Sequence, residues 1–394
     1  MIILEGKFGK CKVFSDKLDQ ESQKQLIDLL NHPIAKDAHV RIMPDVHAEA
    51  SCVIGYTSKL TEIVVPNLIG VDIGCGVTSL QFNKLDIPFD ELDDFIRKEI
   101  PLNTNIRDYP IKINNELEKN IIQVCKETNQ NSDYVLRSIG TLGGGNHFIE
   151  VEKGNYYYLT VHSGSRNFGF KIAKHHQKVA KRMCRLNKMK KRIEEIKKKY
   201  KGKEIERQIK KLKSELKIKS GLEYLTEVYL DKYIEHMKVA QKFAEANRNA
   251  MLNLIIKQFD LKPIKTISSI HNYIDFEDNI IRKGAIRAYK GKLVVIPLNM
   301  KAGIIIGIGK GNPDWNYSAP HGAGREMSRR KAKKSISMKS FEEEMEGIWS
   351  SSIKPSVIDE SPQAYKPPEK ILKYLDKTVE ILDIAKSIYV LKGD

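Results

Sequence analysis

Hydrophobic and polar positions follow both strand and helix spacing along this chain. Residues 1–16 predict one or two strands, and apolar side chains recur at helical spacing in a helix predicted over about 15–31. Further short apolar runs predict strands at 40–43 (ending at Pro44), 63–65, 77–82, 146–150, 156–161 and 388–391, and within 264–308. Helical spacing dominates 87–137 and nearly all of 168–257. Because strands and helices are mixed in this way, the pattern predicts an α+β fold with mixed sheets.

The long helical region is predicted to contain two charged helices followed by a longer one. Glycine interrupts it at Lys201-Gly202-Lys203 and again at Ser220-Gly221. The last helix carries an apolar stripe that predicts core packing rather than a cofactor site: Leu225, Val228, Tyr233, Met237, Val239, Phe243 and Met251. With 394 residues, 41% of them hydrophobic, the chain can bury a substantial core.

Charge is concentrated in one segment. The net charge is +17, and residues 171–220 contain 21 Lys and Arg against 5 Glu, so the rest of the chain is close to neutral. Such a block can bind RNA phosphates through counterion release. It is equally consistent with a solvated helical insertion that lysines keep soluble. Both interpretations remain open on this feature alone.

Cysteine usage and hydropathy indicate the cellular setting. The five cysteines are an odd number without CxxC pairs, which disfavours a disulfide framework or a structural zinc finger and fits a reducing cytosol. The N-terminus has no basic leader, and no apolar run approaches the roughly 20 residues needed to span a bilayer. We therefore expect a soluble, cytoplasmic protein without a membrane partner.

The stretch from Gly70 to Gly76 is the first candidate for chemistry. Asp72 offers a hard oxygen and Cys75, as thiolate, a soft donor that can bridge two metal ions, while the glycines permit a tight bend. By itself, a surface turn with an incidental cysteine explains the stretch as well. The interpretation as a metal site gains weight from other histidine motifs of similar appearance.

Three of these histidines are predicted to lie at strand ends. His147 follows three glycines, which are costly for stability and suggest close approach of the backbone to a ligand. His162 and His271 end two further strands, although a single strand histidine is usually structural. Asp45 and His47 alternate on an extended segment and could share a face, yet a turn-capping aspartate beside a hydrogen-bonded histidine is the commoner arrangement.

His321 lies between small residues at the predicted start of a basic helix over 327–334, with Arg325 close behind. This combination suits phosphate handling. Two familiar nucleotide signatures are absent from the sequence, since no stretch satisfies GxxxxGK[ST] and residues 307–312 fail GxGxxG at the last position.

Eight motifs in order carry a resemblance to a known family. They are MPDVH (43–47), GVDIGCG (70–76), GGGNHFIE (143–150), VHSGSR (161–166), HNY (271–273), KGNP (310–313), HGAGR (321–325) and the C-terminal LKG. Together they resemble the RtcB family of RNA-splicing ligases. Two departures are Ala48-Glu49-Ala50-Ser51, where the family tends to have glycines, and the lack of Gly-Ser before Met300; neither replaces a metal ligand.

The resemblance implies one RtcB-like domain over 1–394, with mixed sheets around a dinuclear metal site and a Lys-rich helical insertion at about 171–220. It implies GTP and two Mn²⁺ ions as cofactors. Asp72, Cys75 and His147 resemble ligands of one ion, and Cys75 would bridge to a second held by His162 and His271. His321 resembles the guanylylated nucleophile. The nucleotide contacts implied are Asn146, Glu150, His271, Asn272, Pro297, Leu298, Asn299, Met300, Gly322, Ala323, Gly324, Tyr365 and Lys392, and the RNA phosphate contacts are Arg166 and Arg325.

The implied reaction joins an RNA 2′,3′-cyclic phosphate or 3′-phosphate end to a 5′-hydroxyl end. A histidine nucleophile suits it, because a neutral imidazole is available near pH 7. tRNA splicing and RNA repair are both compatible, and the need for an activating protein is open. The alternatives are a metal-dependent RNA phosphoesterase acting on the same ends and a non-catalytic RNA-binding protein that relies on the basic helices.

Overall fold

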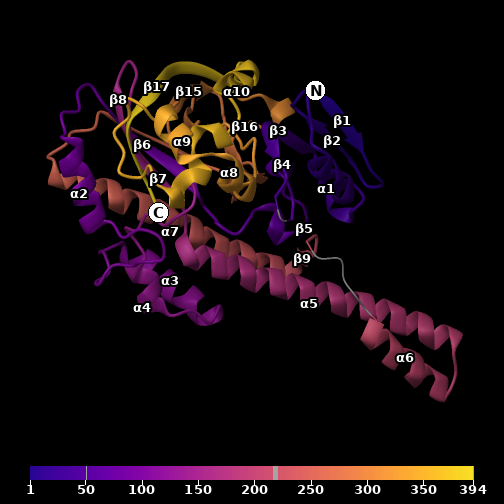
Figure 1. Ribbon diagram of the computed structural model, residues 1–394. Coiled ribbons are helices and arrows are strands. Elements are labelled where there is room, and N and C mark those ends of the chain that lie inside the picture. Colours follow the sequence, from indigo (N-terminus) through magenta and orange to yellow (C-terminus); the bar gives the residue numbers. More distant parts are fainter. Residues whose placement is uncertain (50, 216–220, 394) are drawn as a thin grey trace.

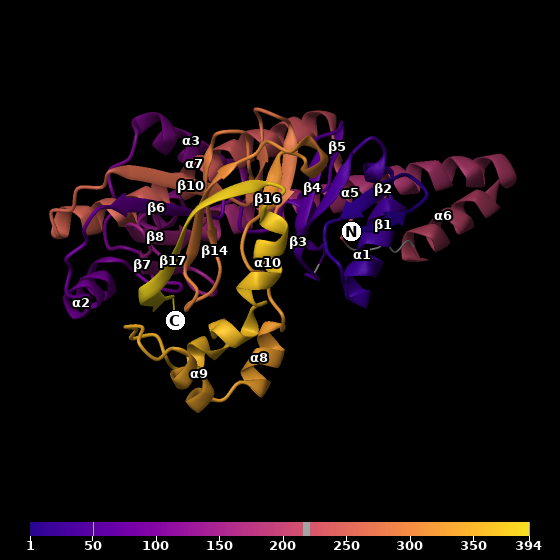
Figure 2. The same cartoon turned by 90° about the horizontal axis from the view of Figure 1, so that it is seen from above.

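A computed structural model describes residues 1–49, 51–215 and 221–393. Two large sheets form the body, and a pair of long helices projects from it (Figure 1). Seen from above, α8 (Arg329–Ser335) and α9 (Met338–Glu344) lie on the opposite side of the strands from α3 (Asn115–Glu127) and α7 (Glu227–Gln258) (Figure 2). The α+β class expected from the sequence is confirmed.

The larger sheet has seven strands, all antiparallel to their neighbours, in the order β10-β6-β8-β7-β17-β15-β14. Their bounds are β6 (Gly76–Phe82), β7 (Phe148–Lys153), β8 (Tyr157–Ser163), β10 (Lys265–Ile270), β14 (Leu293–Pro297), β15 (Ile304–Gly309) and β17 (Val379–Lys392). The register pairs Gly76 with both Ser163 and Ile270. The chain segments next to these three residues therefore meet at one end of the sheet.

The second sheet has six strands in the order β1-β2-β3-β4-β12-β11, and only β2 and β3 run parallel. Its strands are β1 (Ile2–Glu5), β2 (Lys10–Val13), β3 (Val40–His47), β4 (Ile54–Lys59), β11 (Asn272–Asp275) and β12 (Ile280–Lys283). Among the described residues there are also two two-stranded sheets: β13 (Ala285–Arg287) with β16 (Ser318–Pro320), and β5 (Ile63–Val64) with β9 (Leu225–Thr226). One residue, His271, separates β10 of the first sheet from β11 of the second, so the two sheets are joined beside a candidate ligand.

Helices cover the sheets and supply much of the core. Besides those already given, they are α1 (Gln20–Leu30), α2 (Phe89–Glu99), α4 (Ser132–Arg137), α5 (Arg166–Lys199), α6 (Lys203–Glu215) and α10 (Pro368–Leu375). Helix α7 buries Tyr233, Met237 and Phe243 completely, as its apolar stripe predicts. Val228 is an exception, because it lies in the first turn of α7 and is 67% exposed. None of the helices within the described residues is long and apolar enough to cross a membrane.

The projecting arm consists of the distal half of α5 and of α6, which turns back along it (Figure 1). The last residue that α5 buries is Ala180, so nearly twenty residues extend beyond the body. The break predicted around Gly202 is confirmed, since α5 ends at Lys199 and α6 begins at Lys203. The break predicted at Ser220-Gly221 lies largely outside the described residues, because Ser220 is not among them.

Four predicted boundaries are wrong. Strand β3 does not stop at Pro44, because its backbone stays extended to His47, which pairs with Ile54 of β4. Helix α1 begins at Gln20 rather than near residue 15, because the Asp19 side chain accepts the Ser22 N–H and caps the first turn. Strand β17 begins at Val379, nine residues before the predicted strand, because its backbone pairs with β15 and then with β7. Its first part does not alternate apolar-in and polar-out, since Ile381 and Leu382 are exposed while Asp383 is buried, so the residue pattern does not reveal a strand there. His321 does not open a helix: it follows β16 in a loop, and α8 starts only at Arg329.

Candidate active site

A cavity of about 970 Å³ lies where the two sheets and the C-terminal helices meet, a size suited to a nucleotide. It receives side chains from the loop before β6, from the strand ends of β7 and β8, from the β10–β11 junction and from the loop after β16. The cavity is lined by most of the predicted site residues, which come from distant parts of the chain: Asp72, Cys75, Asn146, Glu150, His162, His271, Asn272, Pro297, Leu298, Asn299, Met300, His321, Gly322, Ala323, Gly324, Arg325, Tyr365 and Lys392.

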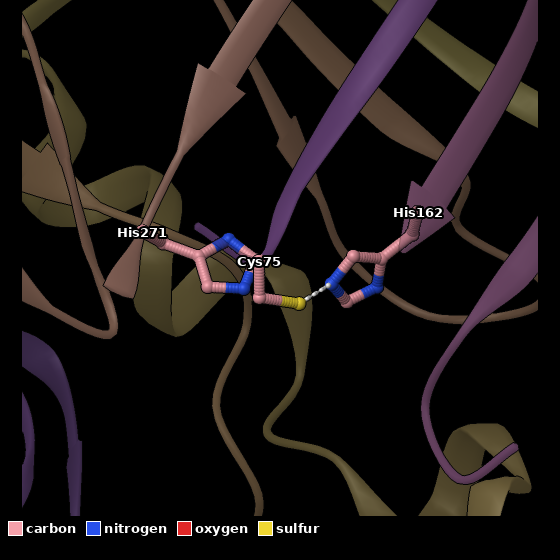
Figure 3. A group of neighbouring side chains, drawn as sticks. All are labelled: Cys75, His162 and His271. Carbon is pink, nitrogen blue, oxygen red and sulfur yellow. Dashed lines mark hydrogen bonds between the residues drawn. The ribbon is translucent and has the colours of Figure 1, made fainter. Parts of the chain in front are cut away.

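Five predicted metal ligands form two groups that share Cys75. Cys75, His162 and His271 make one group, and Asp72, Cys75 and His147 make the other; within each group the ligand atoms lie within 4.8 Å of one another. The Cys75 Sγ lies 3.3 Å from His162 Nε2 and 3.6 Å from His147 Nε2. Figure 3 shows the imidazoles of His162 and His271 on either side of the sulfur. Sulfur, nitrogen and carboxylate donors in this arrangement fit two divalent cations with one shared thiolate.

The protonation states of these groups favour metal binding. Burial lowers the pKa of both His162 and His271 well below the usual value, so the imidazoles are neutral and have a lone pair to donate. Burial alone would raise the pKa of Asp72, but the hydrogen bond and charge of His147 lower it. Burial, and then the charge of Asp72, raises the pKa of the Cys75 thiol well above its usual value. A metal must therefore displace the Cys75 proton, and its affinity rises with pH.

The loop that holds Asp72 and Cys75 is shaped by close backbone contacts. Asp72 Oδ1 accepts the N–H of Ser165 at 3.1 Å. Gly164 lies against the same carboxylate, so a side chain at position 164 would collide with it. Gly74 has φ +74° and packs on α7, where only a glycine fits without strain. Gly74 thus permits the tight bend that the sequence predicted for residues 70–76.

Two polar residues of α7 hold these loops together, and the sequence pattern assigned no chemistry to them. Arg248 is fully buried and donates through Nη1 to the carbonyls of Gly74 at 2.9 Å and Ser163 at 3.0 Å. Asn247, also fully buried, accepts two backbone N–H groups near Thr141 and donates to Gly164 O. The sequence does contain a signal for this role, namely an adjacent Asn-Arg pair inside an apolar helical stripe. Such polar side chains are buried only where they have hydrogen-bond partners.

His321 is held by a buried carboxylate. Its Nδ1 lies 2.6 Å from Asp45 Oδ2, and the same oxygen accepts the His321 backbone N–H at 3.2 Å. Asp45 is completely buried, and the ring of His321 lies 4.8 Å from that of His271. An ionised carboxylate only accepts, so Nδ1 is the donor, and in the neutral ring the lone pair is then on Nε2. Asp45 is thus part of the site, and its interpretation as a turn cap is wrong.

Charged side chains surround the predicted nucleotide contacts. Lys392 Nζ lies 3.4 Å from Glu360 Oε2 and 3.5 Å from the carbonyl of Asn146. Tyr365 donates its hydroxyl to the same carboxylate at 2.6 Å, and Glu360 also accepts from Arg325. Although burial would raise the pKa of Glu360, Lys392 and the nearby arginines lower it. Glu360 lies in none of the sequence motifs, yet it contacts three predicted site residues: Arg325, Tyr365 and Lys392.

The two predicted RNA-phosphate arginines differ in their surroundings. Arg325 lines the cavity, and its Nη2 donates to the carbonyl of Asp359 at 2.6 Å. Arg166 begins α5 next to Ser165, which contacts Asp72 of the candidate metal site. Its guanidinium donates to Thr141 Oγ1 and to the carbonyl of Asn103. Arg166 is not among the side chains that line the cavity, nor is His147, although its Nε2 lies 3.6 Å from the Cys75 Sγ. One further cation in the cavity wall, Lys283, is buried and pairs with Glu49.

Glu150 supplies a pH-dependent prediction. Burial raises its pKa from 4.5 to about 7, and the charge of Lys392 offsets only part of that shift. Because the folded protein holds this proton more tightly than the unfolded chain, the contribution to stability is complete below about pH 4.5 and is lost as the pH rises through 7. From pH 6 to pH 8 this group should remove about 1 kcal/mol from the free energy of unfolding. Urea unfolding of the wild type and of Glu150→Gln at both pH values measures the difference, and an identical pH dependence would contradict the assignment.

Comparison with known proteins gives a consistent result over nearly the whole chain. The family model described as tRNA-splicing ligase RtcB matches residues 25–393. The RNA-splicing ligase RtcB of Escherichia coli K12 is 28% identical, with 95% of each chain covered. The tRNA-splicing ligase RtcB of Nanoarchaeum equitans is 25% identical over 90% of this chain and 88% of its own length.

Proposed function

The chain belongs to the RtcB family of RNA ligases, and from this premise we propose that it joins RNA 2′,3′-cyclic phosphate or 3′-phosphate ends to 5′-hydroxyl ends. The proposed cofactors are GTP and two Mn²⁺ ions, and the proposed nucleophile is His321. The observation that carries the proposal is the position of His321: it faces the same cavity as the metal ligands, and a buried carboxylate holds its Nδ1.

The first proposed step transfers GMP to His321. The Nε2 lone pair attacks the α-phosphorus of GTP, a P–N bond forms, and the bond to the bridging oxygen breaks as pyrophosphate leaves. Asp45 supports this step by keeping the proton on Nδ1 of His321 and by stabilising the positive charge that develops on the imidazole ring. The adduct is a phosphoramidate, which is labile to acid and stable to alkali.

The second and third steps use this activated phosphate. An oxygen of the RNA 3′-phosphate attacks the phosphorus of the adduct, and the P–N bond breaks to return His321. The 5′-hydroxyl then attacks the RNA 3′-phosphorus, and GMP leaves as the new phosphodiester forms. A cyclic phosphate is first opened by water to the 3′-phosphate.

The two ligand groups around Cys75 would hold the divalent cations, which supply charge neutralisation for the phosphates during these steps. For the nucleotide, Glu150 and Lys392 offer an acceptor and a donor at the buried end of the cavity. Tyr365 offers an aromatic face, with the Arg325 guanidinium 5.1 Å from its ring centre. Carboxylate, ammonium and aromatic groups are the chemistry needed to bind a guanine base and the phosphates.

Asp45→Asn tests the positioning role of the carboxylate. An amide can donate to Nδ1, which would leave the proton on Nε2 and remove the attacking lone pair. We expect the rate of GMP adduct formation to fall by about 10²- to 10⁴-fold, as when a histidine loses the acid that orients it. Single-turnover labelling with α-labelled GTP measures the rate, and metal content should not change. An unchanged rate would show that Asp45 does not select the tautomer.

The competing function is a metal-dependent RNA phosphoesterase, because a dinuclear site with nearby cations also suits hydrolysis. A phosphoesterase needs no covalent nucleotide. Incubating the protein with Mn²⁺ and α-labelled GTP, followed by a denaturing gel, therefore separates the two functions. A labelled band supports the ligase, and its absence with every divalent metal tested supports hydrolysis.

A further inference from the structure

Helix α5 carries a line of exposed cations that the proposed chemistry does not use. Six of them recur every three or four residues and therefore lie on one face of the helix. This basic stripe consists of Lys174, Lys178, Lys181, Arg185, Lys188 and Arg192, and every member is exposed. Within the described part of the chain, none of the six forms an ion pair. Their positive charges are therefore free to meet an external anion.

The basic stripe begins about two helical turns beyond the start of α5, which adjoins the loop of the candidate metal ligands, and it leads away from that loop. Helix α5 begins at Arg166, directly after Ser165, whose N–H donates to the metal-site carboxylate of Asp72. From Lys174 to Arg192 the stripe spans about 27 Å, at 1.5 Å per helical residue. Figure 1 shows α5 running from the body into the projecting arm. An extended polyanion with one end in the cavity could thus follow the helix outward.

An exposed aromatic residue precedes the stripe on the same face of α5. Phe170 lies one helical turn after Arg166 and one before Lys174, and it is 43% exposed. The Lys174 Nζ lies 5.6 Å from the centre of its ring. An exposed aromatic ring followed by regularly spaced cations is the combination that binds single-stranded nucleic acid, because bases stack on the ring while cations contact the phosphates.

The arm offers little to other polyanionic surfaces. A helix that lies on a lipid bilayer needs an apolar face to insert. Here Ile193, Ile196, Ile205 and Ile209 are half-buried on the two helices that pack together, and the outward face carries the charges. The face therefore fits a flexible chain of regularly spaced phosphates better than a membrane.

We propose that the basic stripe and Phe170 bind the RNA strand that leads away from the ends being joined. This inference rests on the proposed function in one respect, which is that the bound polyanion is the RNA substrate. At the 3.4 Å per nucleotide of a stacked strand, about 8 nucleotides would cover the stripe, and an extended strand would need fewer. The arm would then add affinity for long RNA without affecting the chemistry at His321.

The test compares two quadruple variants with equal change in charge. The stripe variant is Lys178→Gln, Lys181→Gln, Arg185→Gln and Lys188→Gln. The matched control is Lys190→Gln, Lys191→Gln, Lys197→Gln and Lys198→Gln, whose exposed side chains lie on the other side of the same helix. Circular dichroism checks that α5 remains helical in both variants.

Fluorescence anisotropy gives the dissociation constant for RNA as a function of salt. The probes are 3′-phosphate RNAs of about 6 and about 25 nucleotides and 5′-hydroxyl RNAs of the same two lengths, measured without GTP. For a long probe, a plot of the logarithm of the association constant against the logarithm of the salt concentration should be shallower in the stripe variant, with a slope smaller in magnitude by about 3. The reason is that four phosphate contacts are removed. The control variant should bind like the wild type, and short probes should not distinguish the three proteins. Equal weakening in both variants, or no weakening with any long probe, would overturn the proposal.

Phe170→Ala tests the aromatic contact separately. It should weaken binding of long single-stranded RNA by at least about fivefold, whereas Phe170→Tyr should restore it. Unchanged binding in Phe170→Ala would remove the ring from the proposed path.

Guanylylation without RNA separates this proposal from the proposed function. If a GMP adduct forms but the stripe variant binds long RNA normally, the stripe proposal fails and the ligase function stands. If no adduct forms but the stripe variant alone loses length-dependent RNA binding, the ligase function fails and the RNA surface stands.

Discussion

His321→Ala is expected to abolish the labelled GMP adduct and the joining of 3′-phosphate RNA to 5′-hydroxyl RNA. The reason is that the Nε2 lone pair, kept free by the contact of Nδ1 with Asp45, is the proposed acceptor of the GMP phosphorus. The loss should be complete within the sensitivity of the gel, since alanine at position 321 carries no nucleophilic atom. Metal content should remain normal, because the two ligand groups do not include His321.

A preactivated substrate makes this test sharper. RNA that already carries guanosine at its 3′-phosphate contains the group that His321 is proposed to donate, so His321→Ala should ligate it in Mn²⁺ without GTP. This rescue distinguishes loss of the nucleophile from collapse of the site. An adduct that persists in His321→Ala, or rescue that fails while metal content and folding are normal, would contradict the assigned role.

Cys75→Ala is expected to lose both metal ions, because one sulfur belongs to both ligand groups. Removing a residue that only supports a ligand typically lowers metal affinity 10- to 100-fold, so removing the shared ligand should lower it by at least about 100-fold at each site. Asp72→Ala and His162→Ala should each weaken mainly one ion, since each belongs to one group. Metal analysis after gel filtration gives the number of ions per chain.

Cys125→Ala is the matched control for Cys75→Ala. Cys125 is also a buried free cysteine, but it lies on α3 in the hydrophobic core and outside both ligand groups. The Cys125→Ala variant should therefore bind both metal ions with the affinity of the wild type. If Cys75→Ala binds two ions as tightly as Cys125→Ala does, the shared-thiolate arrangement is wrong.

The sequence by itself determined the residue types of the site and much of the local structure. Helical spacing predicted the two arm helices and the buried stripe of α7, because a side chain's face on a helix depends only on its position along that helix. Motif order indicated Asp72, Cys75 and three histidines as one ligand set. The charge pattern placed the basicity in one insertion. These features are local, so they can be seen without knowing the fold.

Only the tertiary structure decided which side chains meet. Cys75, His162 and His271 come together because β6 pairs with both β8 and β10 in one register. Asp45 reaches His321 across 276 positions of the chain, and no local spacing predicts that contact. The same local pattern that suggests a turn cap at Asp45 is therefore also compatible with a carboxylate that holds the proposed nucleophile.

The polar residues of α7 illustrate the same limit. Their neighbours on the helix are apolar, and helical spacing predicts packing for the whole face. Asn247 and Arg248 are nevertheless buried because backbone carbonyls and N–H groups of the loops around the candidate metal site reach them from other elements. A buried polar group is stable only with such partners, and which partners arrive is decided by sheet order and register, which the spacing of residues along a single helix does not contain.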